Sequence, residues 1–156
     1  MFMCMKKALI SFVGSAETIK LAEIIKEQLE EKNYSVNLTE VIKHKKQPKG
    51  NKGKPVKLKS GITDWKPFDL VVLGFPVIGI SSSHLMNDYL RQCQNVSGKQ
   101  AAIFIGCVGL HGNALKKASG IVSFHGGKVK DSIIVSSFLG LNDKKISQIK
   151  DFALNL

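Results

Sequence analysis

Glycine and hydroxyl residues stand at the junction between an apolar run and a helical pattern near the start of the chain. The run ends at Val13, Gly14 permits a tight turn, and the helical pattern begins with Ser15 and Thr18 in its first turn. The first turn of a helix has unpaired backbone N–H groups and a partial positive charge, so it can hold a phosphate. The hydroxyls of Ser15 and Thr18 would add donors to such a site. The same residues also suit a simple strand-to-helix connection, and residue types alone leave both interpretations open.

Glu17 lies within this junction and affects the prediction in two ways. A carboxylate ~6 Å from a phosphate costs about 1–3 kcal/mol per unit charge at intermediate dielectric. An acidic residue in the first helical turn is also ordinary, because it favours the helix dipole and can take part in a capping box. Glu17 therefore either weakens a phosphate site or caps a helix that binds no phosphate.

The other chemically active side chains form no catalytic or metal-binding pattern. Cys4, Cys93 and Cys107 are widely spaced, unlike metal ligands. His84 follows three serines, but the G-x-S-x-G pattern of a hydrolase nucleophile is absent, so we expect a capping role for this stretch. We therefore predict no catalytic residue and no metal site. Scattered thiols, the lack of a secretory signal pattern and the lack of a membrane-spanning apolar run predict a cytoplasmic protein.

Hydrophobic periodicity indicates an alternation of strands and helices. Five apolar runs have the length of strands that are buried on both faces, and helical patterns separate them. Right-handed crossovers then lead to a doubly wound α/β sandwich. No repeat or domain boundary interrupts the order, which predicts a single domain over residues 1–156. The predicted strands are 7–13, 35–42, 69–75, 100–107 and 132–136. The predicted helices are 15–31, a helix that is capped by one of the serines 81–83 and runs to Cys93, 112–123, and a last helix capped by Asn142.

Three segments at the ends of predicted strands resemble the ligand loops of the flavodoxins. The stretch FVGSAETIKLA, residues 12–22, resembles the phosphate-binding loop and first helix of that family. Residues 71–90 resemble the second loop, and residues 101–118 resemble the third, in which a glycine-rich turn follows a strand. The resemblance covers nearly the whole chain except a lysine-rich insertion. It implies a five-stranded parallel sheet of order 2-1-3-4-5 with helices on both faces, and flavin mononucleotide (FMN) at the carboxyl ends of the strands.

The resemblance also implies which residues would contact FMN, although several depart from the family's pattern. Val13 stands where a hydroxyl residue is usual, Ala16 where glycine is usual, and Glu17 where asparagine is usual. Ile78 replaces an aromatic residue beside the ring, which forgoes a pairing of ~0.5–1.5 kcal/mol. His111 would be a donor or titratable group near the ring, or else a surface histidine. The implied cofactor-binding residues are Val13, Gly14, Ser15, Ala16, Glu17 and Thr18 in the first loop, Pro76, Val77, Ile78 and Gly79 in the second, and Cys107, Val108, Gly109, Leu110, His111 and Gly112 in the third.

Positive charge is concentrated in one segment of the chain. Residues 43–60 contain eight lysines and no acid within a net charge of +11, whereas the rest of the chain holds 15 basic and 12 acidic residues. Such a segment is either a solvated insertion or a docking surface, Lys43–Lys59, that steers an acidic redox protein. Nucleic acid is not the expected partner, because the segment has no arginine and no interleaved aromatic residue.

Two functions from different classes follow from these observations. The first is an FMN-binding protein that transfers electrons through the flavin, as a simple carrier or as an oxidoreductase. The second is a flavodoxin-like domain without flavin, which acts as an interaction module through its basic segment. A flavin titration distinguishes the two.

Overall fold

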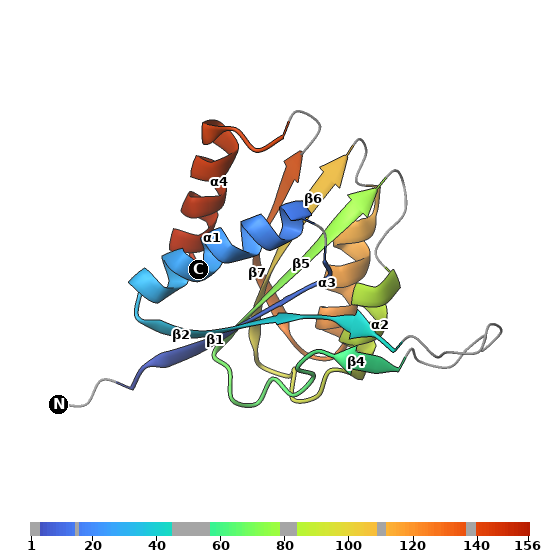
Figure 1. Ribbon diagram of the computed structural model, residues 1–156. Helices are drawn as coiled ribbons and strands as arrows, with labels where there is room; N and C mark the ends of the chain where they lie inside the picture. Colours follow the sequence, from blue (N-terminus) through green and yellow to red (C-terminus); the bar gives the residue numbers. More distant parts are fainter. Residues whose placement is uncertain (1–3, 15, 45–56, 79–83, 109–111, 137–139) are drawn as a thin grey trace.

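A five-stranded parallel sheet forms the centre of the molecule in the computed structural model, which describes residues 4–14, 16–44, 57–78, 84–108, 112–136 and 140–156 (Figure 1). The strand order is β2-β1-β5-β6-β7, and all neighbouring strands are parallel. In chain order these five strands follow the pattern 2-1-3-4-5, as the resemblance implied. The strands are β1 (Lys6–Phe12), β2 (Tyr34–Glu40), β5 (Leu70–Ile78), β6 (Gln100–Val108) and β7 (Lys128–Ser136).

Helices cover both faces of this sheet. Helix α1 (Ala16–Glu31) packs beside α4 (Asp143–Leu154) on one face, and α2 (His84–Gln92) packs beside α3 (Ala114–Phe124) on the other (Figure 1). Since a sheet covered on both faces has no solvated side, its central strands can be apolar throughout. The doubly wound α/β sandwich predicted from the sequence is confirmed. Within the described ranges, no helix combines the length and the apolar character that crossing a membrane requires.

Alternate residues of the central strands divide the core into two layers. Leu9, Val71 and Ile103 belong to the layer under α2 and α3, whereas Ile10 and Val72 belong to the layer under α1 and α4. All five side chains are fully buried. This division follows from the two-residue period of a strand, which sends neighbouring side chains to opposite faces.

A close contact between two neighbouring strands fixes the middle of the sheet. Gly74 of β5 pairs with Phe104 of β6, and a Cβ atom placed on Gly74 would overlap the Phe104 ring. The ring is fully buried. Glycine at position 74 therefore leaves the space that the ring occupies.

A buried polar network ties α2 to the sheet and to the segment that precedes β5. The Tyr89 hydroxyl donates a hydrogen bond to the carbonyl of Ile62 over 2.6 Å. It lies 2.8 Å from the Ser11 hydroxyl and accepts a hydrogen bond of 3.3 Å from the Trp65 indole N–H. Ser11, Trp65 and Tyr89 are fully buried. Because burial disfavours the phenolate, the pKa of Tyr89 is raised far above its usual value, and the hydroxyl stays protonated as the donor of this network.

The structure corrects three predicted strands. The strand predicted as 69–75 continues to Ile78, so β5 includes three residues of the predicted second loop. The predicted strand 35–42 is divided: β2 ends at Glu40, and Ile42–Lys43 forms a short strand, β3, that pairs antiparallel with β4 (Leu58–Ser60). The lysine-rich insertion is thus bounded by a small two-stranded sheet, and its residues 45–56 lie outside the described part of the chain. The last strand begins at Lys128 rather than Ser132, because β7 continues its pairing with β6 across an irregularity at Ala101 and Ala102.

Candidate functional site

The ends of β1, β5 and β6 meet at one edge of the sheet, which we call the carboxyl edge. Phe12 at the end of β1 pairs with Gly74, and the Val13 N–H donates to the Gly74 carbonyl over 2.9 Å. Strands β5 and β6 continue together to Ile78 and Val108. The chain places β2 on one side of β1 and then crosses to the other side of β1 to form β5, so the order in which strands are added reverses between β1 and β5. Sheets of this kind bind ligands beyond the carboxyl ends of the strands at such a switch point.

The first predicted loop leads from β1 directly into the N-terminus of α1. Gly14 is exposed, Ala16 begins the helix, and Thr18 is fully buried in its first turn. A helix of 16 residues presents several backbone N–H groups and a partial positive charge at this end. Ser15 lies outside the described residues. The junction therefore places the N-terminus of a helix at the carboxyl edge, as an anion site requires, with the Thr18 side chain directed into the protein rather than exposed.

A carboxylate that we did not single out from the sequence lies against this loop. Glu40 ends β2, and its carboxyl carbon lies 3.1 Å from the position that a Cβ atom on Gly14 would take. Glu40 is opposite Phe12 in the pairing of β1 with β2, so both strands deliver their last residues to the same edge. The parallel pairing of the first two strands was the signal that could have identified Glu40.

Glu17, the acidic residue that the sequence did identify, occupies the first turn of α1. It is partly exposed and lines a groove of about 420 Å³ between α1 and α4, together with Lys20 and Glu23. There its charge favours the helix dipole. With Glu40, it places two carboxylates around the N-terminus of α1.

The second and third loops are described only in part. Pro76 is partly buried, whereas Val77 is fully buried in the layer under α2 and α3, and Ile78 is the last residue of β5. Cys107 pairs with Val77 and is also buried, which raises the pKa of its thiol. The side chains of Val77 and Cys107 therefore face the core, and only their backbones remain for contact with a ligand. Gly112 is exposed and has a φ of 54°, while Gly79, Gly109, Leu110 and His111 lie outside the described residues; the end of β6 is Val108.

These observations test whether the residues present fit FMN. The switch point, the exposed Gly14 and the N-terminus of α1 suit a phosphate, and β5 and β6 end at the same edge, where the resemblance implies a ring. The carboxylates of Glu17 and Glu40 oppose a phosphate, at about 1–3 kcal/mol per unit charge for a separation of ~6 Å. Among the described residues, the start of α1 therefore suits the phosphate of FMN, whereas these two carboxylates oppose it.

The remaining predictions concern metal ligands, His84 and the lysine-rich docking segment. Among the described residues, no group of three or more histidine, cysteine, aspartate or glutamate side chains is arranged to hold a metal ion. His84 is exposed at the start of α2. Of the predicted docking segment Lys43–Lys59, only the two ends are described, in and beside β3 and β4.

The chain has the flavodoxin-like fold. It is similar over 95% of its length, and of theirs, to oxidised flavodoxin 1 from Bacillus cereus (TM-score 0.70, 16% identity) and to oxidised flavodoxin 2 from the same organism (TM-score 0.71, 18% identity). A flavoprotein in complex with FMN from Lactobacillus acidophilus matches 93% of this chain and 98% of its own, with a TM-score of 0.64 and 19% identity. The sequence matches no family model, and a comparison with curated protein sequences gives no match.

Proposed function

We propose that this protein binds FMN at the carboxyl edge of its sheet and transfers electrons through it. The observation that carries the proposal is the convergence of the end of β1, the N-terminus of α1 and the ends of β5 and β6 at the switch point of the sheet. The likeness of the fold to flavodoxins supports it.

One group of residues at the carboxyl edge would bind the phosphate of the cofactor, and another would contact its ring. The backbone N–H groups of the first turn of α1 would hold the phosphate, and the exposed Gly14 would allow it to approach. The backbones of Val77 and Cys107, near the ends of β5 and β6, would border the ring and exclude water from one side of it. When bound, FMN supplies the chemistry, which is the uptake and release of electrons, and the chain tunes it through backbone donors and local charge.

The direct test is a titration of the purified full-length protein with FMN, followed by quenching of flavin fluorescence. Binding with micromolar or tighter affinity supports the proposal. Riboflavin, which has the same ring but no phosphate, is the control: the proposal requires that FMN binds more tightly than riboflavin. Equal affinity for the two ligands would show that the phosphate adds nothing to binding, and hence that the N-terminus of α1 does not hold it.

A flavin-free interaction module is the second candidate, and the position of Glu40 favours it. A carboxylate against Gly14 can stabilise the partial positive charge of the helix N-terminus in the absence of any ligand. In that case the loop needs no phosphate, and the basic segment around β3 and β4 carries the function. Failure to bind FMN at millimolar concentration would favour this candidate.

A further inference from the structure

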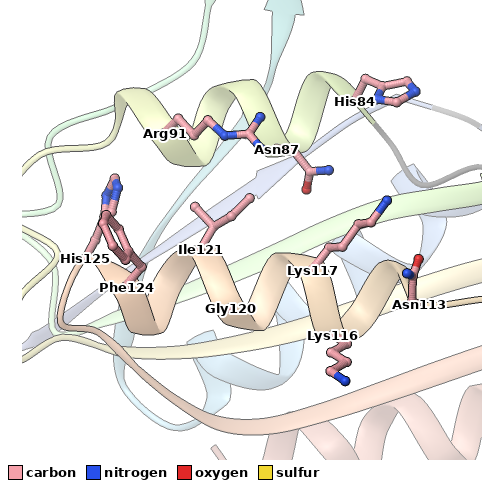
Figure 2. Close-up of a pocket in the computed structure, with 10 residues that line it drawn as sticks. All are labelled: His84, Asn87, Arg91, Asn113, Lys116, Lys117, Gly120, Ile121, Phe124 and His125. Atoms are coloured by element: carbon pink, nitrogen blue, oxygen red, sulfur yellow. The ribbon is translucent and has the colours of Figure 1, made fainter.

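A groove of about 710 Å³ lies between α2 and α3, on the face of the sheet opposite α1 and α4 (Figure 2). Arg91 and Asn87 of α2 border it on one side, and Lys117 and Ile121 of α3 extend toward them from the other. Phe124 stands at one end of the groove. None of the described residues that line it has a carboxylate side chain. The groove is therefore basic and partly apolar. It lies apart from the residues to which the proposed function assigns a role.

The positive charge of this groove is only partly compensated. The Arg91 guanidinium is paired with Asp88, one turn earlier in α2, at 3.4 Å, and the Arg91 side chain remains 59% exposed. Lys116 and Lys117 are both exposed, and within the described part of the chain neither forms an ion pair. Two lysine charges are thus available to a partner.

The exposed side of α3 has an unusual composition for a solvated helix. Lys116, Gly120 and Phe124 follow one another at four-residue intervals, so they share one side of the helix. Phe124 is 88% exposed, although burial of a phenylalanine side chain ordinarily stabilises the folded protein. A Cβ atom on Gly120 would meet no atom within 4 Å. Intramolecular packing therefore does not require the glycine, which weakens the helix relative to alanine and leaves a flat surface beside the exposed ring.

The positive surface continues from the groove toward the lysine-rich insertion. Lys57 and Lys59, at and beside β4, share a shallow depression with Gln92 at the end of α2. Arg91, the preceding residue, lines the groove. The described end of the basic segment therefore lies near the end of α2 that borders the groove.

We propose that the groove between α2 and α3 docks an acidic amphipathic helix of another protein. The apolar side of such a helix would cover Ile121 and Phe124, and Gly120 would allow its backbone to approach closely. Its carboxylates would pair with Lys117, which extends toward α2, and with Lys116, which extends from the other side of α3 (Figure 2). This is the helix-in-groove mode of recognition, with charge added for steering. A nucleic-acid strand fits less well, because Phe124 is the single phenylalanine, tyrosine or tryptophan among the described residues that line the groove, and it lies beside the aliphatic Ile121. A second copy of the chain is disfavoured by a net charge of +11, which makes copies repel each other.

The proposal does not depend on FMN, and it can be tested with the full-length protein alone. The probe is a fluorescein-labelled peptide of about 18 residues, long enough to be helical, with leucines at helical spacing and glutamates on either side of them. Its counterpart carries lysines in place of the glutamates. Fluorescence anisotropy at low ionic strength should show binding of the acidic peptide only.

Matched variants make the test specific for this surface. The double variant Lys116→Glu/Lys117→Glu should weaken binding of the acidic peptide about tenfold, and the difference should shrink in high salt. Lys144→Glu/Lys150→Glu changes the net charge equally on exposed positions of α4, across the sheet, and should change binding by about twofold or less. Gly120→Gln should raise the urea midpoint of the fold, because glutamine favours the helix, yet it should weaken binding several-fold.

Three results would overturn the proposal. The first is equal loss of binding in the α3 and α4 double variants, which would reduce the effect to net charge. The second is tighter binding of single-stranded oligothymidylate than of the acidic peptide, lost in Lys116→Glu/Lys117→Glu, which would make the groove a nucleic-acid surface. The third is self-association in sedimentation velocity that the same variant abolishes, which would make the occupant a second copy.

Discussion

Replacement of Glu40 by glutamine should strengthen FMN binding, since it removes a negative charge from the loop that would hold the phosphate. The carboxyl carbon of Glu40 lies 3.1 Å from the Cβ position of Gly14, so a phosphate on this loop would stand within ~6 Å of the charge. At intermediate dielectric, each unit of phosphate charge is then destabilised by about 1–3 kcal/mol. Glu40→Gln keeps the shape of the side chain, and it should tighten FMN binding by roughly tenfold to a hundredfold.

The assay is a fluorescence titration of the wild type and of the variant, with FMN and with riboflavin. Only FMN should gain affinity, because riboflavin has no phosphate for Glu40 to repel. Glu31→Gln is the matched control: it removes the same charge from the exposed last turn of α1, about 21 Å along the helix from Glu17, beyond the range of a screened charge. Glu31→Gln should bind FMN as the wild type does.

Two results would refute this reasoning. If Glu40→Gln binds FMN with the affinity of the wild type, the carboxylate does not face the phosphate. If FMN and riboflavin gain equally, the substitution has acted on the loop conformation rather than through charge. A separate outcome, in which FMN binds none of the wild type, Glu40→Gln and the further variant Glu17→Gln, would favour the flavin-free candidate for the function.

Three further predictions concern the fold that positions the site. Gly74→Ala should lower the free energy of unfolding by about 1–3 kcal/mol in urea, because the added methyl overlaps the Phe104 ring, whereas Gly120→Ala should raise it by about 0.5–1 kcal/mol. Tyr89→Phe should lower it by about 1–3 kcal/mol, since three buried polar groups lose their common partner; a change smaller than a few tenths would show that they find new ones. Burial raises the pKa of Cys93 from 9.0 to about 12, so the folded state keeps a proton that the unfolded chain releases. The free energy of unfolding should therefore fall as the pH rises from 9 toward 12, and that of Cys93→Ala should fall less steeply over the same range, as measured by urea unfolding at each pH.

Much of the fold could be predicted because its determinants are local. Residues 70–75 and 101–105 are apolar without interruption, and only a strand covered on both faces needs such a run. The strand boundaries were less predictable: Lys128, Lys130 and Asp131 of β7 have no strand-like character, and they join the sheet because β6 offers its edge to them. The division between β2 and β3 depends in the same way on pairing with β4, which follows it by more than a dozen residues.

The candidate site shows the same distinction between local and long-range determinants. The sequence by itself predicted a strand that ends near Gly14, a helix that begins shortly after it and the acidic Glu17 in the first turn of that helix, because these features depend on neighbouring residues only. Only the tertiary structure decided that Glu40 lies against Gly14 and that Lys117 and Arg91 border one groove. Such contacts depend on strand register and helix packing, which join residues far apart in the chain, and no local pattern of residue types specifies them.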